Sequence, residues 1–489
     1  MRLSYQAIPY LAPCYRPALD PATRHVRLVH LGIGAFHRAH QAAYTERCGD
    51  WGICGVTERS ANVLRQLGPQ DGLYTLTERA NSAASVSVVG AVREIINAGD
   101  DPLAVVARIA DPDVRVVTVT VSEKGYRYDP SSGLLQADDP EITADLAGRP
   151  PRTVVGQIAI GIAARAASGG PPLTVVCCDN IPANGRLLSR LVRDFLDRGN
   201  YPSSSLDWLA GNLAFPSTMV DRIVPATTVA DKEWVAAEIG LEDQGAVVTE
   251  PFTQWVIEDS FTGGRPAWEL AGAVIAEEVG PYERLKLRML NGTHSALAYL
   301  GGLAGYQTIA EAVADLDLAL YARRLMSEDI APSLAPPQGI DLAQYQDSVL
   351  ERFANTALRH TVRQVSTDGS KKMPLRVLGT IRDRRAVGAE PLLAALAIAA
   401  WIWHVVAGRD DLGRPFQPDD PMLTVIRARV PAAADTAPAA AVDGLLAIRA
   451  IFGDLGDDTW LRPTLTQLVH ALAAHGALDV IRTILKNGA

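Results

Sequence analysis

A lysine, an asparagine and a histidine lie close together in the segment KLRMLNGTHS, which begins at Lys286. On an ideal helix, at about 100° per residue, Lys286 and His294 fall within an arc of roughly 80° that also holds leucines, and Asn291 flanks that arc. Arg284 and Arg288 point roughly the opposite way, toward the side expected to meet water. A cation and an imidazole on the apolar face of a helix predict a site with a chemical task.

A glycine turn, GIGAFH from Gly32 to His37, predicts a dinucleotide cofactor. It follows a β-rich run and opens a helical one, and Gly32 and Gly34 allow backbone amides to approach a pyrophosphate closely. His37 replaces the third glycine of the usual fingerprint. Glu58 lies 24 positions after Gly34, at the end of the next strand, where a carboxylate can accept the adenosine ribose hydroxyls. The alternative is a glycine turn that only packs a helix on a strand.

The residues around Glu58 leave two cofactors open. Glu58 favours NAD, because a carboxylate repels the 2′-phosphate of NADP, but Arg59 and Ser60 follow at once and can cradle that phosphate. His37 and His40 are spaced so that they could hold a metal ion. We favour a polar helix start beside phosphates for these two histidines.

If a nicotinamide cofactor oxidises a secondary alcohol, a base must remove the hydroxyl proton. Lys286 is a candidate for this base. An unperturbed lysine has a pKa of ~10.4 and is a poor base at neutral pH. Burial and the positive ring of NAD⁺ both disfavour its charged form. Asn291 can stabilise the alkoxide, and His294 can bind a neighbouring hydroxyl or orient the lysine. Lys286 and His294 are ~12 Å apart along an ideal helix, so they share one ligand only if it is long, like an open-chain polyol, or if the helix begins after Lys286.

Polar residues also lie at the C-terminal end of the strand expected at 172–178, in the block CDNIPANG. Ligands gather at the carboxyl ends of parallel strands, so Asp179 and Asn180 are well placed, and Asn184 is a second amide nearby. Either amide can complete an oxyanion hole. The alternative is that Asp179 and Asn180 only cap the following helix.

Composition excludes several other classes of protein. The chain has five cysteines without CxxC or Cys/His ligand spacing, which argues against a disulfide framework and a structural zinc site. We therefore expect metal-independent chemistry. The net charge of −9 and the absence of a Lys/Arg-rich run argue against a nucleic-acid partner.

Hydrophobic patterning predicts an α/β chain of 489 residues in two parts: a Rossmann-type dinucleotide-binding domain over 1–280 and a mostly α-helical substrate-binding and catalytic domain over 281–489. In the first part, strands alternate with helices, which predicts a parallel doubly wound sheet. The strands are expected at 25–31, 51–58, 114–126, 172–180 and 245–259, with an antiparallel place at the sheet edge considered for the last, and the helices at 36–48, 101–110, 153–169 and 184–199.

One apolar stretch, LLAALAIAAWIWHVVAG at 392–408, is short for a membrane span and contains His404. We expect a buried core helix there rather than a span. The N-terminus lacks the pattern of a signal peptide, so a cytoplasmic protein without a membrane partner is expected.

Over almost its full length the chain resembles the mannitol dehydrogenase family, the polyol-specific long-chain dehydrogenases/reductases. The blocks that carry the resemblance are GIGAFHRAHQA, WGICGV, EKGY, CDNIPANG, FPSTMVDRI, EPFTQWVIED, KLRMLNGTHS and STDGSKKMP. The resemblance implies a Rossmann-type N-terminal domain, a helical C-terminal domain, NAD or NADP as cofactor, no zinc, and a monomer.

The resemblance also implies residue roles. Lys286 is the general base, Asn291 and Asn180 form the oxyanion hole, His294 binds substrate, and Asp221 of the MVDRI block is the acidic residue near the lysine. The implied cofactor contacts are Gly32, Gly34, Phe36, His37, Glu58, Glu123 and Lys124.

Members of the family act on mannitol, arabinitol, fructuronate and tagaturonate. Four basic residues near STDGSKKMP, namely Arg359, His360, Lys372 and Arg376, are candidate substrate contacts that would suit the carboxylate of a uronate. The alternative is that they are ordinary surface charges. We expect interconversion of D-mannitol and D-fructose, with fructuronate reductase or another polyol such as D-arabinitol as alternatives. A non-catalytic dinucleotide-binding sensor is the alternative from another class.

Overall fold

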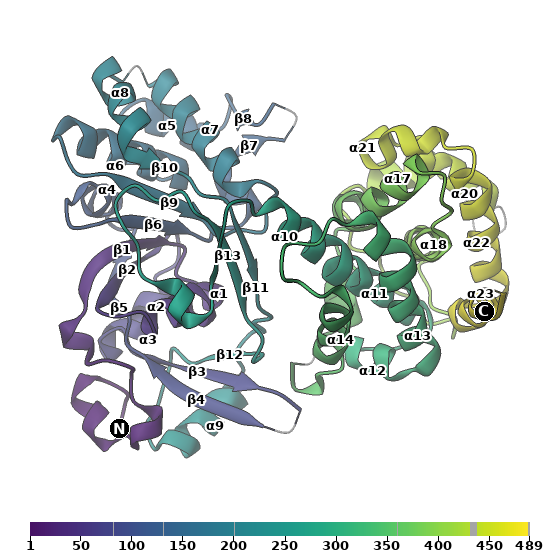
Figure 1. Ribbon diagram of the computed structural model, residues 1–489, viewed down its shortest axis with the longest axis horizontal. Helices are drawn as coiled ribbons and strands as arrows, with labels where there is room; N and C mark the ends of the chain where they lie inside the picture. Colours follow the sequence, from purple (N-terminus) through teal and green to yellow (C-terminus); the bar gives the residue numbers. More distant parts are fainter. Residues whose placement is uncertain (82, 131, 200, 359, 431–437, 488–489) are drawn as a thin grey trace. The chain divides into compact units, whose positions relative to one another are not determined.

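The computed structural model describes residues 1–489 except 82, 131, 200, 359, 431–437 and 488–489. The chain divides into two compact units, Met1–Gly280 and Pro281–Ala489 (Figure 1).

The first unit is built around a six-stranded parallel sheet with the order β10-β9-β6-β1-β2-β5. Its strands are β1 (His25–Leu31), β2 (Trp51–Thr57), β5 (Val92–Asn97), β6 (Val116–Val119), β9 (Leu173–Cys177) and β10 (Leu213–Ala214). The helices of this unit are α1 (Ala35–Ala39), α2 (Gln41–Glu46), α3 (Asn62–Leu67), α4 (Pro102–Ala110), α5 (Pro140–Leu146), α6 (Val154–Ala167), α7 (Asn184–Arg198), α8 (Ser203–Asn212) and α9 (Val229–Ile239). This arrangement confirms the predicted Rossmann-type fold.

Alternate residues of the strands supply two separate cores, one on each face of the sheet. Val29 and Val117 belong to the core formed with α4, α6 and α7. Leu28 and Val116, their neighbours in sequence, belong to the core formed with α2 and with Trp255. Both faces are therefore covered, as a parallel sheet requires.

The predicted strand over 245–259 is wrong in extent and in place. The segment forms two strands, β12 (Val247–Thr249) and β13 (Gln254–Glu258), which belong to two different three-stranded sheets outside the main one. One small sheet has the order β12-β3-β4, with β3 (Tyr74–Arg79) and β4 (Ala84–Val89), and the other has the order β11-β13-β14, with β11 (Thr218–Asp221) and β14 (Val274–Ala276). Long-range pairing partners, which local patterning does not specify, decide this outcome.

Two further elements are shorter than predicted. The helix expected at 36–48 is broken at His40, whose backbone leaves the helical region with φ −121° and ψ −90°, so α1 and α2 are separate. The strand expected over 114–126 ends at Val119, and Glu123–Tyr126 forms a 3-10 turn before the hairpin of β7 (Tyr128–Asp129) and β8 (Leu134–Leu135).

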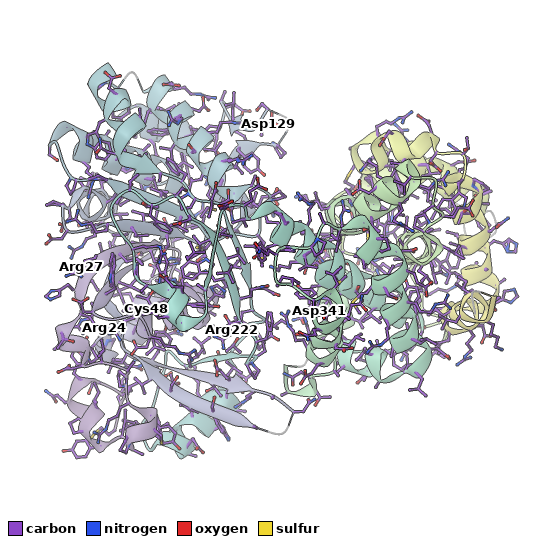
Figure 2. The ribbon with its side chains drawn as sticks, viewed as in Figure 1. Arg24, Arg27, Cys48, Asp129, Arg222 and Asp341 are labelled. Carbon is purple, nitrogen blue, oxygen red and sulfur yellow. The ribbon has the colours of Figure 1, made fainter. Side chains whose placement is uncertain are left out.

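Two buried arginines, labelled in Figure 2, join segments of the first unit that are distant in sequence. Arg24 pairs with Glu46 at 3.0 Å and donates to the Gly49 carbonyl. Arg222 pairs with Glu78 and donates to the Glu250 carbonyl. All five cysteines are free, including the buried Cys48.

The second unit is helical. Its helices are α10 (Gly280–Leu285), α11 (Thr293–Leu303), α12 (Ile309–Ala314), α13 (Leu316–Arg324), α14 (Leu342–Phe353), α15 (Val362–Val365), α16 (Gly369–Met373), α17 (Gly379–Ala386), α18 (Leu392–Ala407), α19 (Leu423–Arg429), α20 (Pro438–Leu446), α21 (Arg449–Phe452), α22 (Leu461–His475) and α23 (Ala477–Asn487). The apolar stretch at 392–408 is α18, which is buried along most of its length in the core of this unit. Among the described residues, no helix is both long and apolar enough to span a membrane.

The segment that carries Lys286 departs from an ideal helix. Between α10 and α11 the chain forms a π-helical segment, Lys286–Gly292. A π turn contains more residues than an α turn, so the angles of an ideal α-helical wheel do not hold through it. The prediction that Arg288 faces water is also wrong, because its side chain is 11% exposed and pairs with Asp383 at 2.6 Å.

Candidate active site

A cleft of about 730 Å³ lies in the first unit at the carboxyl ends of β1, β2, β6 and β9. In an open parallel sheet this edge is where ligands bind. Its walls include five of the predicted cofactor residues, together with Asn180: Gly32, Gly34, Phe36, Glu58 and Lys124. The cleft therefore brings together most of the residues that were predicted from separate parts of the sequence.

The turn after β1 needs a glycine at position 32. Gly32 has φ +94°, and a Cβ there would lie 2.0 Å from the Thr120 carbonyl oxygen. Beneath the turn, Nε2 of the buried His30 lies 2.8 Å from the Thr120 hydroxyl and 3.2 Å from the Gly32 carbonyl. Burial lowers the pKa of His30 to about 3, so its ring is neutral. This role of His30 was not predicted from the sequence. A polar residue within an apolar strand, next to a glycine turn, was the pattern that could have predicted it.

His37 is not part of the cleft wall. Its ring is buried and stacks on His30 with 3.4 Å between centroids, and burial lowers its pKa well below the usual range. The residue thus packs beneath the glycine turn, on the side away from solvent, and is not a polar helix start. Glu123 lies on the exposed 3-10 turn next to Lys124 and does not line the cleft either.

Glu58 directly follows β2, and one of its carboxylate oxygens is bound while the other has no partner in the described chain. Gln157 of α6 donates from Nε2 to Oε2 at 3.2 Å, whereas Oε1 is buried and has no hydrogen bond within the described chain. Burial raises the pKa of this carboxyl to about 7, although Gln157 and Arg59 act in the opposite direction. A buried acceptor without a partner fits a ligand hydroxyl.

Asp179 joins two walls of the cleft. Its carboxylate accepts hydrogen bonds from the amides of Val121 and Ser122, at 2.9 and 3.0 Å, and from the hydroxyl of Tyr126 at 2.6 Å. The blocks EKGY and CDN therefore form one structural unit, in which Asp179 fixes the loop after β6. Burial raises the pKa of this carboxyl, and Tyr126 and the two amides counteract that rise.

The two candidate amides after β9 have different surroundings. Nδ2 of Asn184 donates to the carbonyls of Asp179 and Thr218 at 2.9 and 3.0 Å, and its Oδ1 accepts from the Thr218 amide. Asn184 is thus buried and engaged in holding β9 to β11. Asn180 is exposed and lines the cleft, so it is the amide of this pair that a ligand can reach.

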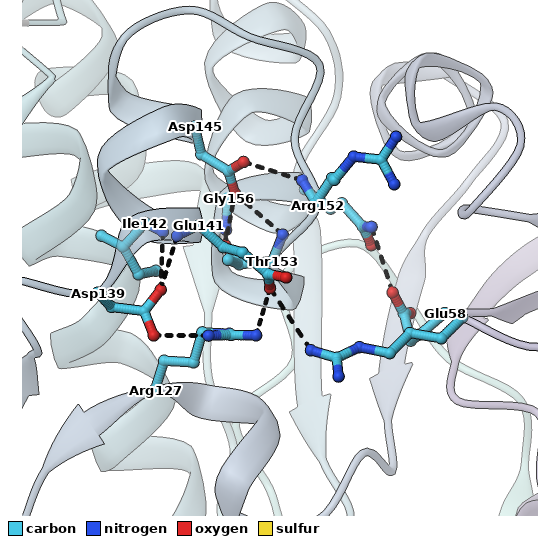
Figure 3. A network of polar contacts seen from close by, with 11 residues as sticks. Glu58, Arg127, Asp139, Glu141, Ile142, Asp145, Arg152, Thr153 and Gly156 are labelled. Carbon is cyan, nitrogen blue, oxygen red and sulfur yellow. Dashed lines mark hydrogen bonds and ion pairs between the residues drawn. The ribbon is translucent and has the colours of Figure 1, made fainter.

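Three arginines line the cleft together with Glu58, and Figure 3 shows the polar network around them. Arg127 pairs with Asp139 at 2.5 Å and with Glu141, and Arg59 lies 3.4 Å from the same Glu141. Arg152 precedes α6. Sequence patterns did not predict Arg127 or Arg152 as cleft residues, because neither lies in a recognisable motif.

The second unit presents Lys286, Asn291 and His294 from a single stretch of helix. Lys286 is buried at the start of the π-helical segment, Asn291 lies near its end, and His294 is in the first turn of α11. The Asn291 side chain is partly exposed and makes no hydrogen bond with any other described residue. Its amide is therefore available to a ligand.

His294 sits in a crowded and positively charged environment. Its ring stacks on Phe353 and contacts His360 edge-on, with centroids 4.8 and 4.7 Å apart. Burial, followed by His360 and Arg376, lowers the pKa of His294 well below the usual range. Its Nε2 is buried without a partner among the described residues. A neutral imidazole of this kind can exchange hydrogen bonds with a substrate hydroxyl.

Lys372 and Arg376 are partly buried cations without a carboxylate partner in the described chain. Lys372 donates to the Thr367 hydroxyl at 3.1 Å, and Arg376 donates to the Ser295 hydroxyl at 3.0 Å. Burial and Arg376 lower the pKa of Lys372 to about 8, and burial lowers that of Arg376 to about 10. Arg359 lies outside the described residues. Asp221 is buried at the end of β11 in the first unit.

The π-helical segment packs against a second one, Pro374–Leu378. Gly292 makes this contact possible, since a Cβ there would lie 2.7 Å from the Arg376 carbonyl oxygen. The bond from Arg376 to Ser295 adds a side-chain link between the same segments. The contact thus ties the stretch with Asn291 and His294 to the stretch with Arg376.

Within the described residues, no group of three or more His, Cys, Asp and Glu side chains is arranged to hold a metal ion. His40, one of the two histidines considered for such a site, lies 2.9 Å from the Gln254 carbonyl through Nε2, and its ring stacks on Phe36.

Comparison with known proteins gives matches along most of the chain. Family models match residues 26–270, as a mannitol dehydrogenase Rossmann domain, and 278–473, as a mannitol dehydrogenase C-terminal domain. The uncharacterized oxidoreductase YdfI of Escherichia coli is 41% identical, with 94% of this chain and 96% of that protein covered. D-mannonate oxidoreductase of E. coli is 39% identical, with 84% and 86% covered. The structure of Pseudomonas fluorescens mannitol 2-dehydrogenase with NAD and D-mannitol is 36% identical, with a TM-score of 0.86 over 99% of this chain and 100% of that one.

Proposed function

The chain belongs to the mannitol dehydrogenase family, and we propose that it is an NAD-dependent oxidoreductase that interconverts D-mannitol and D-fructose without a metal ion. In this proposal the first unit binds the dinucleotide, and the second supplies the general base and the substrate contacts. The relative described with NAD and D-mannitol supports this choice of cofactor and substrate.

The residues of the cleft fit a dinucleotide. Gly32 keeps the turn after β1 open to a close-lying phosphate, and Glu58 offers a buried oxygen without a partner to a ribose hydroxyl. Gly34, Phe36 and Lys124 line the same space. When bound, the nicotinamide accepts or donates the hydride.

Proton transfer is assigned to the second unit. Lys286 is proposed to take the hydroxyl proton of the alcohol through Nζ, which requires that the amine be neutral before the reaction. Asn291 is proposed to donate from its amide to the oxygen that gains negative charge, and Asn180 is proposed as the second amide. His294 is proposed to bind a neighbouring hydroxyl of the polyol.

The observation that carries this proposal is that Lys286, Asn291 and His294 lie on one helical stretch. The Asn291 amide and the Nε2 atom of His294 have no hydrogen-bond partner in the described chain. A protein that only senses a dinucleotide has no use for such a set. As partners the proposal requires only the cofactor and a small polyol or ketose. We further propose that the chain acts as a monomer in the cytoplasm, which size-exclusion chromatography and cell fractionation test.

A second candidate is a uronate reductase that interconverts D-mannonate and D-fructuronate. The observation that favours it is the pair Lys372 and Arg376, because partly buried cations without a carboxylate partner in the described chain suit the carboxylate of a substrate. The similarity to D-mannonate oxidoreductase supports this candidate.

One experiment separates these functions. The purified protein is mixed with NADH and with either D-fructose or D-fructuronate, and the absorbance of NADH is followed. We expect turnover with D-fructose. Turnover with D-fructuronate alone would replace the first candidate by the second, and no turnover with any polyol, ketose or uronate of the family would favour a sensor.

A further inference from the structure

A second cavity, of about 440 Å³, lies in the first unit at the opposite edge of the main sheet from the cofactor cleft described above. It adjoins His25 at the amino end of β1, whereas Gly32 follows the carboxyl end of that strand. Arginines from three separate segments line it: Arg24, Arg27, Arg93 and Arg108. We infer that this cavity binds a phosphate group, with Arg93 and Arg27 as the principal donors. The inference does not depend on the reaction proposed above.

Gly52 leaves room for the Arg93 side chain at the amino end of β2, the strand that separates β1 from β5. A Cβ at position 52 would lie 2.9 Å from the Arg93 Cγ and 3.0 Å from the His25 carbonyl oxygen. The side chain of Arg93 therefore lies over the glycine, beside the strand that carries His25 and Arg27. Because β2 has no side chain here, arginines from two strands that are not neighbours in the sheet share one cavity.

The guanidinium of Arg93 has an aromatic neighbour but no hydrogen bond within the described chain. Its Cζ lies 4.8 Å from the centre of the Tyr5 ring. Its Nη1 is buried, and no described residue accepts a hydrogen bond from it. Burial lowers the pKa of this guanidinium, and Glu94 counteracts that effect. A buried donor without an acceptor is rare in a folded protein, and an anion in the cavity would supply the acceptor.

Two of the other arginines have carboxylate partners that fix them as walls of the cavity. Arg24 has a fully buried side chain and lies 3.0 Å from Glu46. Arg108 pairs with Glu94, and its Nη1 lies 2.8 Å from Asp111. Glu94 also lines the cavity, but its charge is compensated by this pairing. These groups leave the binding of an anion to the remaining two arginines.

Arg27 is the second cation that can bind an anion. It pairs with Asp50 at 3.3 Å, and 37% and 47% of the two side chains are exposed. An exposed pair of this kind contributes little to stability, so Arg27 can bind a ligand without a large loss. Its Cζ lies 5.7 Å from the centre of the Trp51 ring. A guanidinium that stacks on a ring directs its N–H groups outward in its own plane, where they bind phosphate oxygens in pairs.

The cavity favours a phosphate over a smaller anion. A phosphate dianion offers several acceptor oxygens, which two planar guanidinium groups can share. The volume of about 440 Å³ is within the range of small-molecule sites and leaves room for an organic group attached to the phosphate. One carboxylate opposes the anion: Asp113 is exposed in the wall and makes no ion pair with a described residue. Removal of that charge should therefore strengthen binding.

Calorimetric titration of the full chain with inorganic phosphate, at constant ionic strength, tests this inference. We expect saturable binding with a Kd of about 1 mM or lower, both without NADH and with saturating NADH, because the cofactor cleft lies at the other edge of the sheet. Methyl phosphate distinguishes the sources of the group: equal affinity indicates a phosphate ester as ligand, and affinity lower by about tenfold indicates the free ion. The absence of saturable binding, or its loss with NADH, would overturn the inference.

Arg93→Gln should weaken phosphate binding about tenfold or more and leave the affinity for NADH unchanged, which also shows that the variant is folded. Arg115→Gln is the matched control. Arg115 is likewise half-buried and directly precedes β6 at the same edge of the sheet, where its amide donates to the Arg27 carbonyl at 2.8 Å, but it does not line the cavity. Equal losses in both variants would reduce the effect to overall charge and overturn the inference.

Two further variants separate charge from geometry. Arg93→Lys retains the charge but not the planar pair of donors, so its affinity for phosphate should lie between those of Arg93→Gln and the wild type. Asp113→Asn removes a negative charge from the wall and should strengthen phosphate binding about twofold or more. Weaker binding in Asp113→Asn would contradict the placement of the anion in this cavity.

Discussion

The carboxylate of Asp179 accepts a hydrogen bond from the hydroxyl of Tyr126, with 2.6 Å between Oδ2 and Oη. The same carboxylate accepts hydrogen bonds from the amides of Val121 and Ser122. Three donors from the loop after β6 therefore bind one side chain that follows β9. Because Ser122 lines the cleft and adopts φ +69°, an unusual conformation for a residue with a side chain, we regard Asp179 as the anchor of this wall.

Asp179→Asn should therefore weaken NADH binding about tenfold, because an amide nitrogen would face at least one backbone donor. Titration calorimetry measures the affinity. Tyr126→Phe is the control, since it removes one hydrogen bond and leaves both loop amides satisfied, and its effect should be smaller. Unchanged affinity in Asp179→Asn would mean that the loop holds its shape without this carboxylate.

Lys286→Ala should reduce kcat by roughly 10²–10⁴-fold, the range expected for loss of a general base, while NADH binding is retained. Steady-state kinetics with the polyol and calorimetry with NADH measure the two effects. Added methylamine should restore part of the activity of Lys286→Ala, because a free amine can replace the missing base. Near-normal turnover of the variant would remove Lys286 from the mechanism, and a deficit without rescue would point to a structural role.

Gly292→Ala should lower kcat more than it lowers affinity for NADH, because the added methyl group would displace the Arg376 backbone and with it Asn291 and His294. Overpacking of this kind also costs about 1–3 kcal/mol of stability, which thermal unfolding measures. Gly301→Ala, in the adjoining helix α11, is the matched control, since its Cβ would lie 2.8 Å from the Ala312 Cβ of α12. We expect a similar loss of stability in the control without the loss of kcat. Equal losses of kcat in both variants would contradict a positioning role for Gly292.

The pH dependence of uronate binding tests Lys372. Its pKa is lowered to about 8, so the amine is a cation below that pH and loses its charge as the pH rises through it. If Lys372 binds a carboxylate, the KM for fructuronate, or its inhibition constant against fructose, should rise above pH 8. The KM for uncharged fructose should not follow the same curve, and Lys372→Ala should abolish the difference. A flat ratio of the two constants between pH 7 and 9 would exclude this contact.

Local sequence patterns determined the class of fold and the position of the cofactor turn. Strands such as β2 and β9 and helices such as α6 and α7 agree with the hydrophobic periodicity that predicted them, because burial on a regular element leaves a repeat in the sequence. The spacing of Gly32, Gly34 and Glu58 likewise reflects a local strand–turn–helix unit and the strand that follows it. The segment KLRMLNGTHS was recognisable by its residue types alone.

Only the tertiary structure decided how these residues are used. The π-helical segment at Lys286 packs against residues 374–378, His37 is stacked on His30, and Asn184 is engaged with Thr218. Arg152 joins Glu58 in one cleft from 94 positions away in the chain. Each of these relationships depends on contacts between distant segments, whose pairing is selected by packing and hydrogen bonding of the whole unit. Local periodicity does not indicate which distant segments pair. The sequence therefore determined which side chains are present, and the tertiary structure decided which of them are in contact.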